Sequence, residues 1–566
     1  MTVLAAESSL RLDTNWVDYL LIGVYFAFVL GIGVLARRSV STSLDFFLSG
    51  RSLPAWVTGL AFISANLGAV EIIGMSANGA NYGIPTVHYF WVGAVPAMLF
   101  LGVVMMPFYY GSKVRSVPEF MRRRFGTGAH LVNAISFAVA QLLIAGINLY
   151  LLANIVEIIL GWNLWVSLIV AAIVVLTYTS LGGLSAAIYN EVLQFFVIVA
   201  ALLPLTLIGL HKVGGWGGLK EKVAASSGGA EQLSSWPGQA LTGFDSPLLS
   251  VIGIVLGLGF VLSFGYWTTN FVEVQRAMAS SSISAAQRAP IIGAFPKMFV
   301  PFIVIFPGMI AAVLVNEISG PKNSGGDPDY NNALLYLIRD LLPNGMLGVA
   351  IAGLLASFMA GMAANISAFN TVFSYDLWET YVVKDRPDGY YLKVGRAATF
   401  GATIIAIGTA TFAASYSNIM DYLQTLFGFF NAPLFATFIL GMFWKRMTAT
   451  AGWVGLVSGT TAAVVVGILS EDALGGLSVG AIGLSGQGAS FVAAGAAFVV
   501  DIVVSIAVTM VTRPREESEL RGLVYSLTPK ADFHDDGEGV LAWYQKPNVL
   551  AGVGLGIVVL LNILFW

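Results

Sequence analysis

The sequence predicts an all-α integral membrane protein with about fourteen transmembrane helices. Three observations support this fold class: the composition, the apolar runs and the distribution of basic residues between the runs. Of the 566 residues, 57% are hydrophobic and 10% are charged, whereas soluble domains average roughly 45–50% apolar and about 25% charged residues. The net charge of -3 argues against a nucleic-acid partner, and the absence of Cys excludes disulfides, zinc-thiolate sites and thiol nucleophiles.

Each predicted span is a run of mostly apolar residues, and about 20 of them are needed to cross roughly 30 Å of hydrocarbon. Polar or basic clusters bound the runs. Fourteen runs lie near 17–36, 55–82, 85–110, 128–160, 165–183, 187–210, 248–272, 290–315, 346–375, 395–415, 419–444, 449–470, 488–512 and 547–565. An even number of spans places both ends of the chain on one side of the membrane.

The basic residues decide which side that is, because Lys and Arg accumulate in cytoplasmic loops. Most of the 28 Lys and Arg residues follow the first, third, seventh, ninth, eleventh and thirteenth runs. We therefore expect a multi-pass protein of the cell membrane with both termini extracellular. The long stretches 211–247 and 316–345 read as external loops, with one short helix near 331–341.

Two of the runs are interrupted by polar residues and Gly. The second run contains 64–71 (SANLGAVE), and the seventh contains 262–265 (LSFG) and 268–270 (TTN). Broken helices at matching places in two halves of a chain point to a transporter's midplane site, because freed carbonyls and helix ends can bind ions and polar solutes. The alternative is that Gly and Ser only let neighbouring helices approach closely.

The five-span offset between the interruptions predicts a five-plus-five inverted repeat, with one extra helix before it and three after it. In this interpretation the chain 1–566 is a single transmembrane transporter domain. Its parts are an accessory helix at 17–36, a first repeat at 55–210, a second repeat at 248–444 and accessory helices at 449–566. No stretch is long or polar enough for a separate soluble domain.

Ionisable residues inside the runs are few, and each needs a partner or a cavity because charge in hydrocarbon is costly. Glu71 lies in the first interruption, Glu191 begins the sixth run and Lys297 lies inside the eighth. We predict that Glu71 and Lys297 share a central cavity; the alternative is a buried pair that only fixes helix packing. Asp421 and Asp501 are expected to be structural.

Aromatic and amide side chains would complete a site for a sugar-like solute, because flat rings cover apolar sugar faces while polar groups bond the hydroxyls. Such side chains occur in the third, seventh and eleventh runs. The candidates are Tyr89, Phe90, Trp91, Tyr266, Trp267 and Gln424.

Six blocks of the chain, in order, resemble the solute:sodium symporter family and especially its sodium/sugar cotransporter branch. They are 45–56 (DFFLSGRSLPAW), 117–126 (VPEFMRRRFG), 182–196 (GGLSAAIYNEVLQFF), 266–276 (YWTTNFVEVQR), 297–307 (KMFVPFIVIFP) and 443–459 (FWKRMTATAGWVGLVSG). The resemblance covers nearly the whole chain. It implies the family's inverted-repeat fold, the one shared with amino-acid and sugar transporters.

The resemblance also implies a set of solute-binding residues. It matches Asn66, Lys297 and Gln424 to polar contacts, Tyr266 to the ring that covers the sugar from the cytoplasmic side, and Met75 to the outer gate. Glu71 replaces a Gln, Phe90 a sugar-bonding Glu and Ser263 an Asn. The solute-binding set is therefore Asn66, Glu71, Met75, Tyr89, Phe90, Ser263, Tyr266, Trp267, Lys297 and Gln424. A hexose, another polyol, a sugar acid and an amine-bearing solute remain open.

For sodium, the resemblance implies backbone carbonyl ligands at Ser64, Leu67 and Ser357 and two adjacent hydroxyl ligands. The hydroxyl positions are Ala360 and Gly361 in this chain. A hard cation needs about six oxygens, so water, Asn365 or Ser367 would have to replace the two that are missing.

Sodium is thus the coupling ion that the resemblance implies, and a proton is the alternative, carried by Glu71 with help from Glu191. The resulting prediction is a secondary active symporter that imports a small polar solute by alternating access, as a monomer or homodimer in the lipid bilayer. The alternatives are a proton-coupled symporter, a uniporter and a solute sensor. An enzyme is not expected, because the four His residues form no metal or triad pattern and no phosphate loop occurs.

Overall fold

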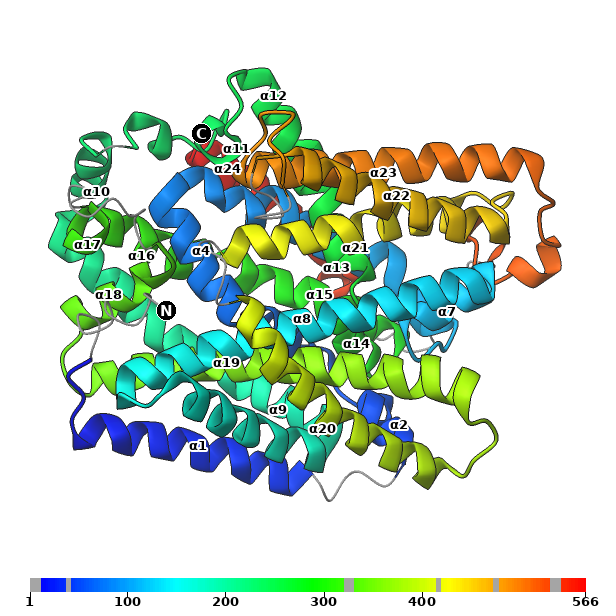
Figure 1. The fold of residues 1–566 in the computed structure, drawn as a ribbon, viewed down its shortest axis with the longest axis horizontal. Helices are drawn as coiled ribbons and strands as arrows, with labels where there is room; N and C mark the ends of the chain where they lie inside the picture. The colour runs from blue at the N-terminus through cyan, green and yellow to red at the C-terminus, as the bar shows by residue number, and fades with distance from the viewer. Residues whose placement is uncertain are drawn as a thin grey trace.

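The computed structural model describes residues 12–36, 42–226, 228–319, 330–413, 419–471, 478–529 and 541–566. Within these ranges the regular structure is helical, apart from one isolated bridge between Leu53 and Ser280. Figure 1 shows long helices lying side by side along the longest axis of the molecule, with the start of α1 (Trp16–Ala36) and the C-terminal end of the chain toward the same end of the bundle.

The long helices coincide with the predicted runs. Their bounds are α1 (Trp16–Ala36), α3 (Ala55–Asn66), α4 (Ala69–Tyr82), a helix Ile84–Gly111, α8 (Thr127–Leu160), α9 (Leu164–Val213), a helix Pro247–Thr269, α15 (Ile283–Lys297), α16 (Pro301–Leu314), α19 (Met346–Thr371), α20 (Asp388–Ala413), α21 (Ile419–Phe443), α22 (Ala449–Leu469), α23 (Gly486–Val511) and α24 (Pro547–Leu564). The last part of Ile84–Gly111 is α6 (Met106–Gly111). Shorter helices connect the long ones, among them α2 (Ser43–Leu48), α7 (Val117–Phe125), α10 (Gly215–Ala224) and α18 (Ala333–Leu341). The last of these matches the short helix expected near 331–341.

Eleven of the described helices are long and apolar enough to cross a membrane, and the bent pair of α3 and α4 raises this number to 12. The predicted count of fourteen is therefore only partly supported. The stretch 165–183 contributes the shorter helix Leu164–Thr177, and 395–415 lies in α20. α20 includes Lys393 and Arg396 near its start, and α9 is interrupted at Gly183, where the backbone leaves the helical region with φ +55°.

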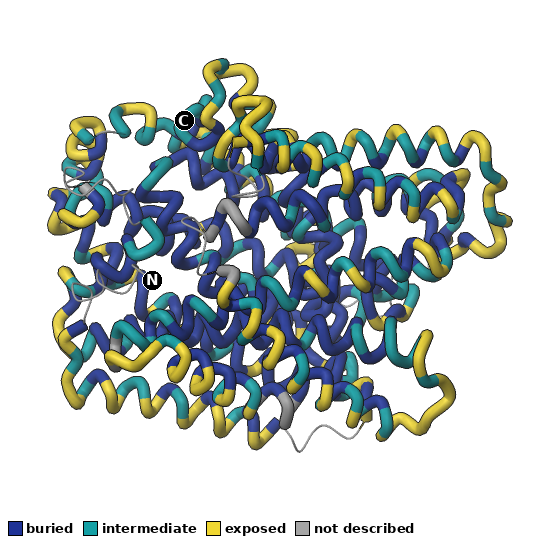
Figure 2. The backbone as a smooth tube through the Cα atoms, viewed as in Figure 1, coloured by how far each residue is buried: buried dark blue, intermediate teal, exposed yellow. Residues whose placement is uncertain are grey.

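The outer helices present large apolar side chains on the surface, while the interior is almost continuously buried (Figure 2). α24 exposes Val559 and Ile563, and α23 exposes Val503 and Val511. A soluble monomer rarely exposes contiguous apolar surface of this kind. The outer face of the bundle is thus suited to hydrocarbon.

The predicted interruption of the second span is confirmed. α3 ends at Asn66, α4 begins at Ala69, and the two helices are bent by 57°. Leu67 (ψ 45°) and Gly68 (ψ 177°) leave the helical conformation. The break exposes helix-end carbonyls and amides inside the bundle, as expected for an interrupted membrane helix.

The interruption of the seventh span lies later than one of the two predicted places. The segment 262–265 was expected to unwind, and this prediction is wrong: a wide-turn π-helix, η8 (Gly253–Ser263), continues directly into α13 (Phe264–Thr269). The break comes at Asn270, which is extended with ψ 116° and precedes α14 (Phe271–Met278). The Asn270 side chain accepts a hydrogen bond from the Val272 amide at 3.0 Å and so caps the new helix.

α4 and α16 pack closely because each presents a small residue at the contact. A Cβ at Gly308 would lie 2.8 Å from the Ser76 carbonyl carbon and 3.0 Å from the Ala80 nitrogen, both on the backbone of α4. Small residues at such crossings let membrane helices approach backbone to backbone.

Gly308→Ala should therefore destabilise the fold by about 1–3 kcal/mol, the usual effect of overpacking a tight contact. Gly401→Ala is the matched control, because Gly401 also lies inside a long helix but a Cβ there meets nothing within 4 Å. We expect thermal unfolding in detergent at a lower temperature for the first variant only. Equal melting temperatures would contradict the proposed helix contact.

Candidate functional site

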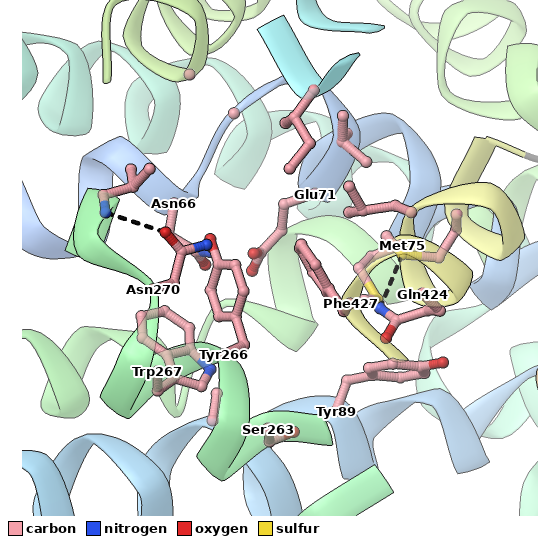
Figure 3. A pocket seen from close by; sticks show the side chains of 18 of the residues that line it. Asn66, Glu71, Met75, Tyr89, Ser263, Tyr266, Trp267, Asn270, Gln424 and Phe427 are labelled. Carbon is pink, nitrogen blue, oxygen red and sulfur yellow. Dashed lines mark hydrogen bonds between the residues drawn. The ribbon is translucent and has the colours of Figure 1, made fainter. Parts of the chain in front are cut away.

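A cavity of about 100 Å³ lies where the two broken helices meet. Figure 3 shows Glu71 pointing into it, with Asn66, Tyr266 and Trp267 on one side and Met75, Gln424 and Phe427 on the other. All ten predicted solute-binding residues line this cavity: Asn66, Glu71, Met75, Tyr89, Phe90, Ser263, Tyr266, Trp267, Lys297 and Gln424. The tertiary structure thus brings together residues from the second, third, seventh, eighth and eleventh predicted runs.

The charged centre of the cavity is an ion pair between Lys297 and Glu71. The Lys297 ammonium donates hydrogen bonds to Glu71 Oε1 and to Asn66 Oδ1. Glu71 lies in the first turn of α4 and Lys297 in the last turn of α15, positions where the helix dipoles favour these charges. The Lys297 side chain is 1% exposed and that of Glu71 13%, so the carboxylate is the member of the pair that a solute can reach.

Aromatic rings surround the ammonium. Lys297 Nζ lies 5.0 Å from the centre of the Phe90 ring and 5.1 Å from that of Trp267. Ring faces attract cations, and Trp267 is held in place by stacking on Phe62 at 5.7 Å. Phe90, the residue at the position of a sugar-bonding Glu, therefore contributes a cation contact and an apolar wall.

Tyr266 links the two broken helices on one side of the cavity. Its hydroxyl accepts a hydrogen bond from Asn66 Nδ2 at 3.0 Å and donates one to Glu273 Oε1 at 2.8 Å. Its ring lies 4.5 Å from that of Phe427. The Tyr266 hydroxyl thus connects Asn66 at the first break to Glu273 of α14.

The remaining wall is partly polar. Gln424 donates a hydrogen bond to the Met420 sulfur at 3.4 Å, one turn away on α21, and Tyr89 donates one to Gln487 of α23. Apolar rings with a few fixed amide, hydroxyl and carboxylate groups are suited to a solute with both apolar faces and hydroxyls.

The predicted sodium positions lie where the first break contacts α19. Ser357 Oγ donates a hydrogen bond to the Leu67 carbonyl at 2.7 Å, and Ser64 Oγ is buried without a hydrogen-bond partner in the described structure. Ala360 is fully buried beside Gly361. Of the five predicted ion ligands, Ser64, Leu67, Ser357, Ala360 and Gly361, only Gly361 also lines the solute cavity.

An amide that the sequence interpretation missed lies at this contact. A Cβ built on Gly361 would be 2.7 Å from Asn148 Oδ1, and one on Gly68 would be 3.1 Å from the same atom. Asn148 is buried, and its Oδ1 has no hydrogen-bond partner among the described residues. Because Gly361 has no side chain, the Asn148 oxygen can lie close to its backbone.

Of the two residues predicted as replacement sodium ligands, one lines the solute cavity and the other does not. Asn365 lines the solute cavity and donates a hydrogen bond to the Gly361 carbonyl at 2.7 Å, whereas Ser367 does not line it.

Glu191 lies away from the cavity. It is buried and forms a two-point ion pair with Arg276, at 2.5 and 3.3 Å. Asp501 is also outside the cavity, where it accepts hydrogen bonds from Thr437 and Ser505. The side chain of Asp421 lies outside the described residues.

Sequence reasoning missed Glu273, which is fully buried and bonded to Tyr266. The predicted seventh run ended at residue 272, so the search for charges inside runs stopped one residue short. No group of three or more His, Asp or Glu side chains that could hold a metal ion occurs among the described residues.

Comparison with known proteins gives a consistent result. Residues 46–459 match the sodium:solute symporter family. The chain is 28% identical over 470 residues to a sodium/glucose cotransporter of Vibrio parahaemolyticus, covering 80% of this chain and 85% of the relative. It is 29% identical over 466 residues to sodium/myo-inositol cotransporter 2 of Oryctolagus cuniculus, covering 78% and 68%.

The fold is also similar to a solved structure. A Na⁺-coupled sialic acid symporter in a substrate-bound, outward-open state superposes with a TM-score of 0.73 at 18% identity, covering 89% of this chain and 99% of the other. At this identity the likeness concerns the fold, which is the LeuT-like inverted-repeat transporter fold.

The Glu71–Lys297 pair yields a test by a double-mutant cycle. Lys297→Met alone should cost about 3–5 kcal/mol, because it leaves a buried carboxylate unpaired. Adding Glu71→Gln should restore most of that loss, since both charges are then gone. Thermal unfolding of the two single variants and the double variant measures the coupling. Strictly additive losses would show that the two side chains do not interact.

Proposed function

The chain belongs to the sodium:solute symporter family, and from this premise we propose that it imports a neutral sugar or polyol together with sodium by alternating access. It is a multi-pass membrane transporter and not an enzyme. The observation that carries the proposal is the cavity between the two broken helices, which joins an ion pair, amides and aromatic rings.

The charge of the cavity supports a neutral solute. Glu71 and Lys297 neutralise each other, so the cavity lining has no excess charge to attract a sugar acid or an amine. Glu71, the accessible member of the pair, supplies a carboxylate that can accept hydrogen bonds from hydroxyl groups. The glucose and myo-inositol cotransporters among the relatives make a hexose and a cyclic polyol the first solutes to test.

We propose that sodium binds at the contact between the first break and α19. The Leu67 carbonyl and Asn148 Oδ1 are oxygens that border this contact, and the Ser64 carbonyl is a further predicted ligand. Oxygen ligands are what a hard cation requires. In this proposal Asn148 replaces a hydroxyl ligand that Ala360 and Gly361 cannot supply.

The two sites share one structural element, because Asn66 and Leu67 are neighbours at the first break. A cation that orders the break also positions Asn66 toward Lys297 and Tyr266. In this mechanism Met75 gates the outer side and Tyr266 the inner side.

One cation crossing 100 mV supplies roughly 2.3 kcal/mol, and a tenfold concentration gradient of that cation adds about 1.4 kcal/mol. Together these are enough for several-hundred-fold accumulation of solute.

The proposed topology has fourteen spans, with repeats at 55–210 and 248–444, both termini extracellular and the protein in the cell membrane. The broken second span and the 11 or 12 described helices able to cross a membrane support this arrangement in part. Proton coupling through Glu71 and Glu191 is the second candidate, favoured by the absence of hydroxyls at Ala360 and Gly361.

Uptake into proteoliposomes tests the function. Labelled glucose, galactose and myo-inositol are offered under an inward sodium gradient and, separately, an inward proton gradient at the same membrane potential. We expect accumulation with sodium alone. Accumulation with protons alone would overturn sodium coupling, and equilibration without accumulation under either gradient would indicate a uniporter.

Asn148→Leu tests the proposed sodium ligand. Loss of one oxygen should raise the sodium concentration for half-maximal uptake about tenfold, equivalent to roughly 1.4 kcal/mol. Asn148 also lines the solute cavity, so the half-saturating solute concentration is measured at saturating sodium, and we expect it to change less than the sodium dependence does. Gln141→Leu is the matched control, because Gln141 is a buried amide of α8 whose Oε1 is likewise unpartnered in the described structure. Equal sodium dependence in both variants would remove Asn148 from the site.

A further inference from the structure

A second group of buried charges lies beyond Tyr266, on the side of the cavity toward α14. It consists of Glu273 and Arg276 of α14 and Glu191 of α9, and all three side chains are almost completely buried. Together with Glu71 and Lys297, the interior here holds three carboxylates and two cations. One carboxylate therefore exceeds the available positive charge.

The excess carboxylate is Glu273. Lys297 is engaged by Glu71 and Asn66, and Arg276 is engaged by both oxygens of Glu191, by the Val272 carbonyl and by Gln275 Oε1. Glu273 forms no ion pair within 4.0 Å among the described residues, and its Oε2 has no hydrogen-bond partner there. Its Oε1 accepts the Tyr266 hydroxyl at 2.8 Å.

The surroundings of Glu273 leave no other charge to balance it. α14 packs against α2, α3, α6, α13, α15 and α19. The sequences of α3 and α19 contain no ionisable residue, and α6 contains two tyrosines whose hydroxyls bond to the Thr268 and Ser280 carbonyls. Asp45 of α2 accepts the Thr42 amide. Arg288 of α15 donates a hydrogen bond to the Ser284 carbonyl at 3.3 Å. Tyr266 of α13 and Lys297 of α15 are the other ionisable groups on these helices.

Two opposing effects act on this carboxylate. Its position in the first turn of α14 and the hydrogen bond from Tyr266 favour the ionised form. Burial without a counter-charge favours the protonated form, because an unpaired charge in an apolar interior is costly. Protonation of Oε2 removes the charge. Oε1 then remains as a neutral acceptor for the Tyr266 hydroxyl.

We propose that Glu273 is a proton-binding site that controls the inner gate. In the ionised state, the chain of hydrogen bonds from Asn66 through Tyr266 to Glu273 holds the Tyr266 ring across the cavity. A proton taken from the aqueous phase onto Oε2 weakens the acceptor, because hydrogen bonds to a charged group are roughly twice as strong as neutral ones. Tyr266 is then freed, and solute release becomes faster at low internal pH.

The proposal rests on the proposed transport function, but its first test does not. Infrared difference spectra of the purified protein, recorded as pH is lowered, should contain the carbonyl band of a buried carboxylic acid, and Glu273→Gln should remove that band. Asp501→Asn is the control for a buried carboxylate outside the site. Persistence of the whole band in Glu273→Gln would overturn the proposal, whether or not the tested solutes are transported.

The second test measures exchange of labelled solute in proteoliposomes with equal sodium and solute on both sides and no membrane potential. In the unmodified protein we expect the exchange rate to rise as internal pH falls. Glu273→Gln should give a rate independent of internal pH, whereas Asp501→Asn should keep the dependence. A pH dependence unchanged in Glu273→Gln would contradict the proposal.

Tyr266→Phe provides a variant that keeps the carboxylate. It removes the hydrogen bond to Glu273, so exchange should become insensitive to internal pH while the infrared band still titrates. If thermal unfolding shows that Glu273→Gln does not fold, Tyr266→Phe still tests the proposal. Retained pH dependence in Tyr266→Phe would show that Glu273 does not act through Tyr266.

Discussion

The core of this protein depends on pairing the charges that the apolar interior encloses. Lys297 can be buried because Glu71 and Asn66 accept its hydrogen bonds and because two aromatic rings face its ammonium. The two charges also lie at helix ends of opposite polarity, created where α4 begins and α15 ends. The ion pair therefore joins the first break to the eighth predicted span and fixes the position of the cavity between them.

The break in the second span serves the solute cavity and the proposed ion site together. Asn66 faces the cavity from the end of α3, while the next residue, Leu67, turns its carbonyl to Ser357 of α19. The two contacts therefore come from adjacent residues of one irregular segment. Tyr266 extends the same connection to α14 through its hydrogen bonds to Asn66 and Glu273.

Much of the fold could be predicted from local sequence, because a membrane span is recognised by length and apolarity alone. The interruption at 64–71 could be predicted because several polar residues and a Gly in succession disfavour a continuous helix inside hydrocarbon. The same reasoning failed at 262–265, where Ser263 is the last residue of a helix of wider turns and Gly265 lies in the α-helix that continues it. Asn148 was missed because one amide in a long span gives no signal until its neighbours are known, and Glu273 because a predicted end was placed one residue too early.

The sequence by itself determined the membrane class, the positions of the spans, the first break and the residue types that gather in the cavity, because these follow from hydropathy and from motifs along the chain. Only the tertiary structure decided which charges pair. Glu71 contacts Lys297 across 226 residues of sequence, and Glu191 contacts Arg276 across 85. Those contacts depend on helix packing, and they leave Glu273 without an ion-pair partner among the described residues.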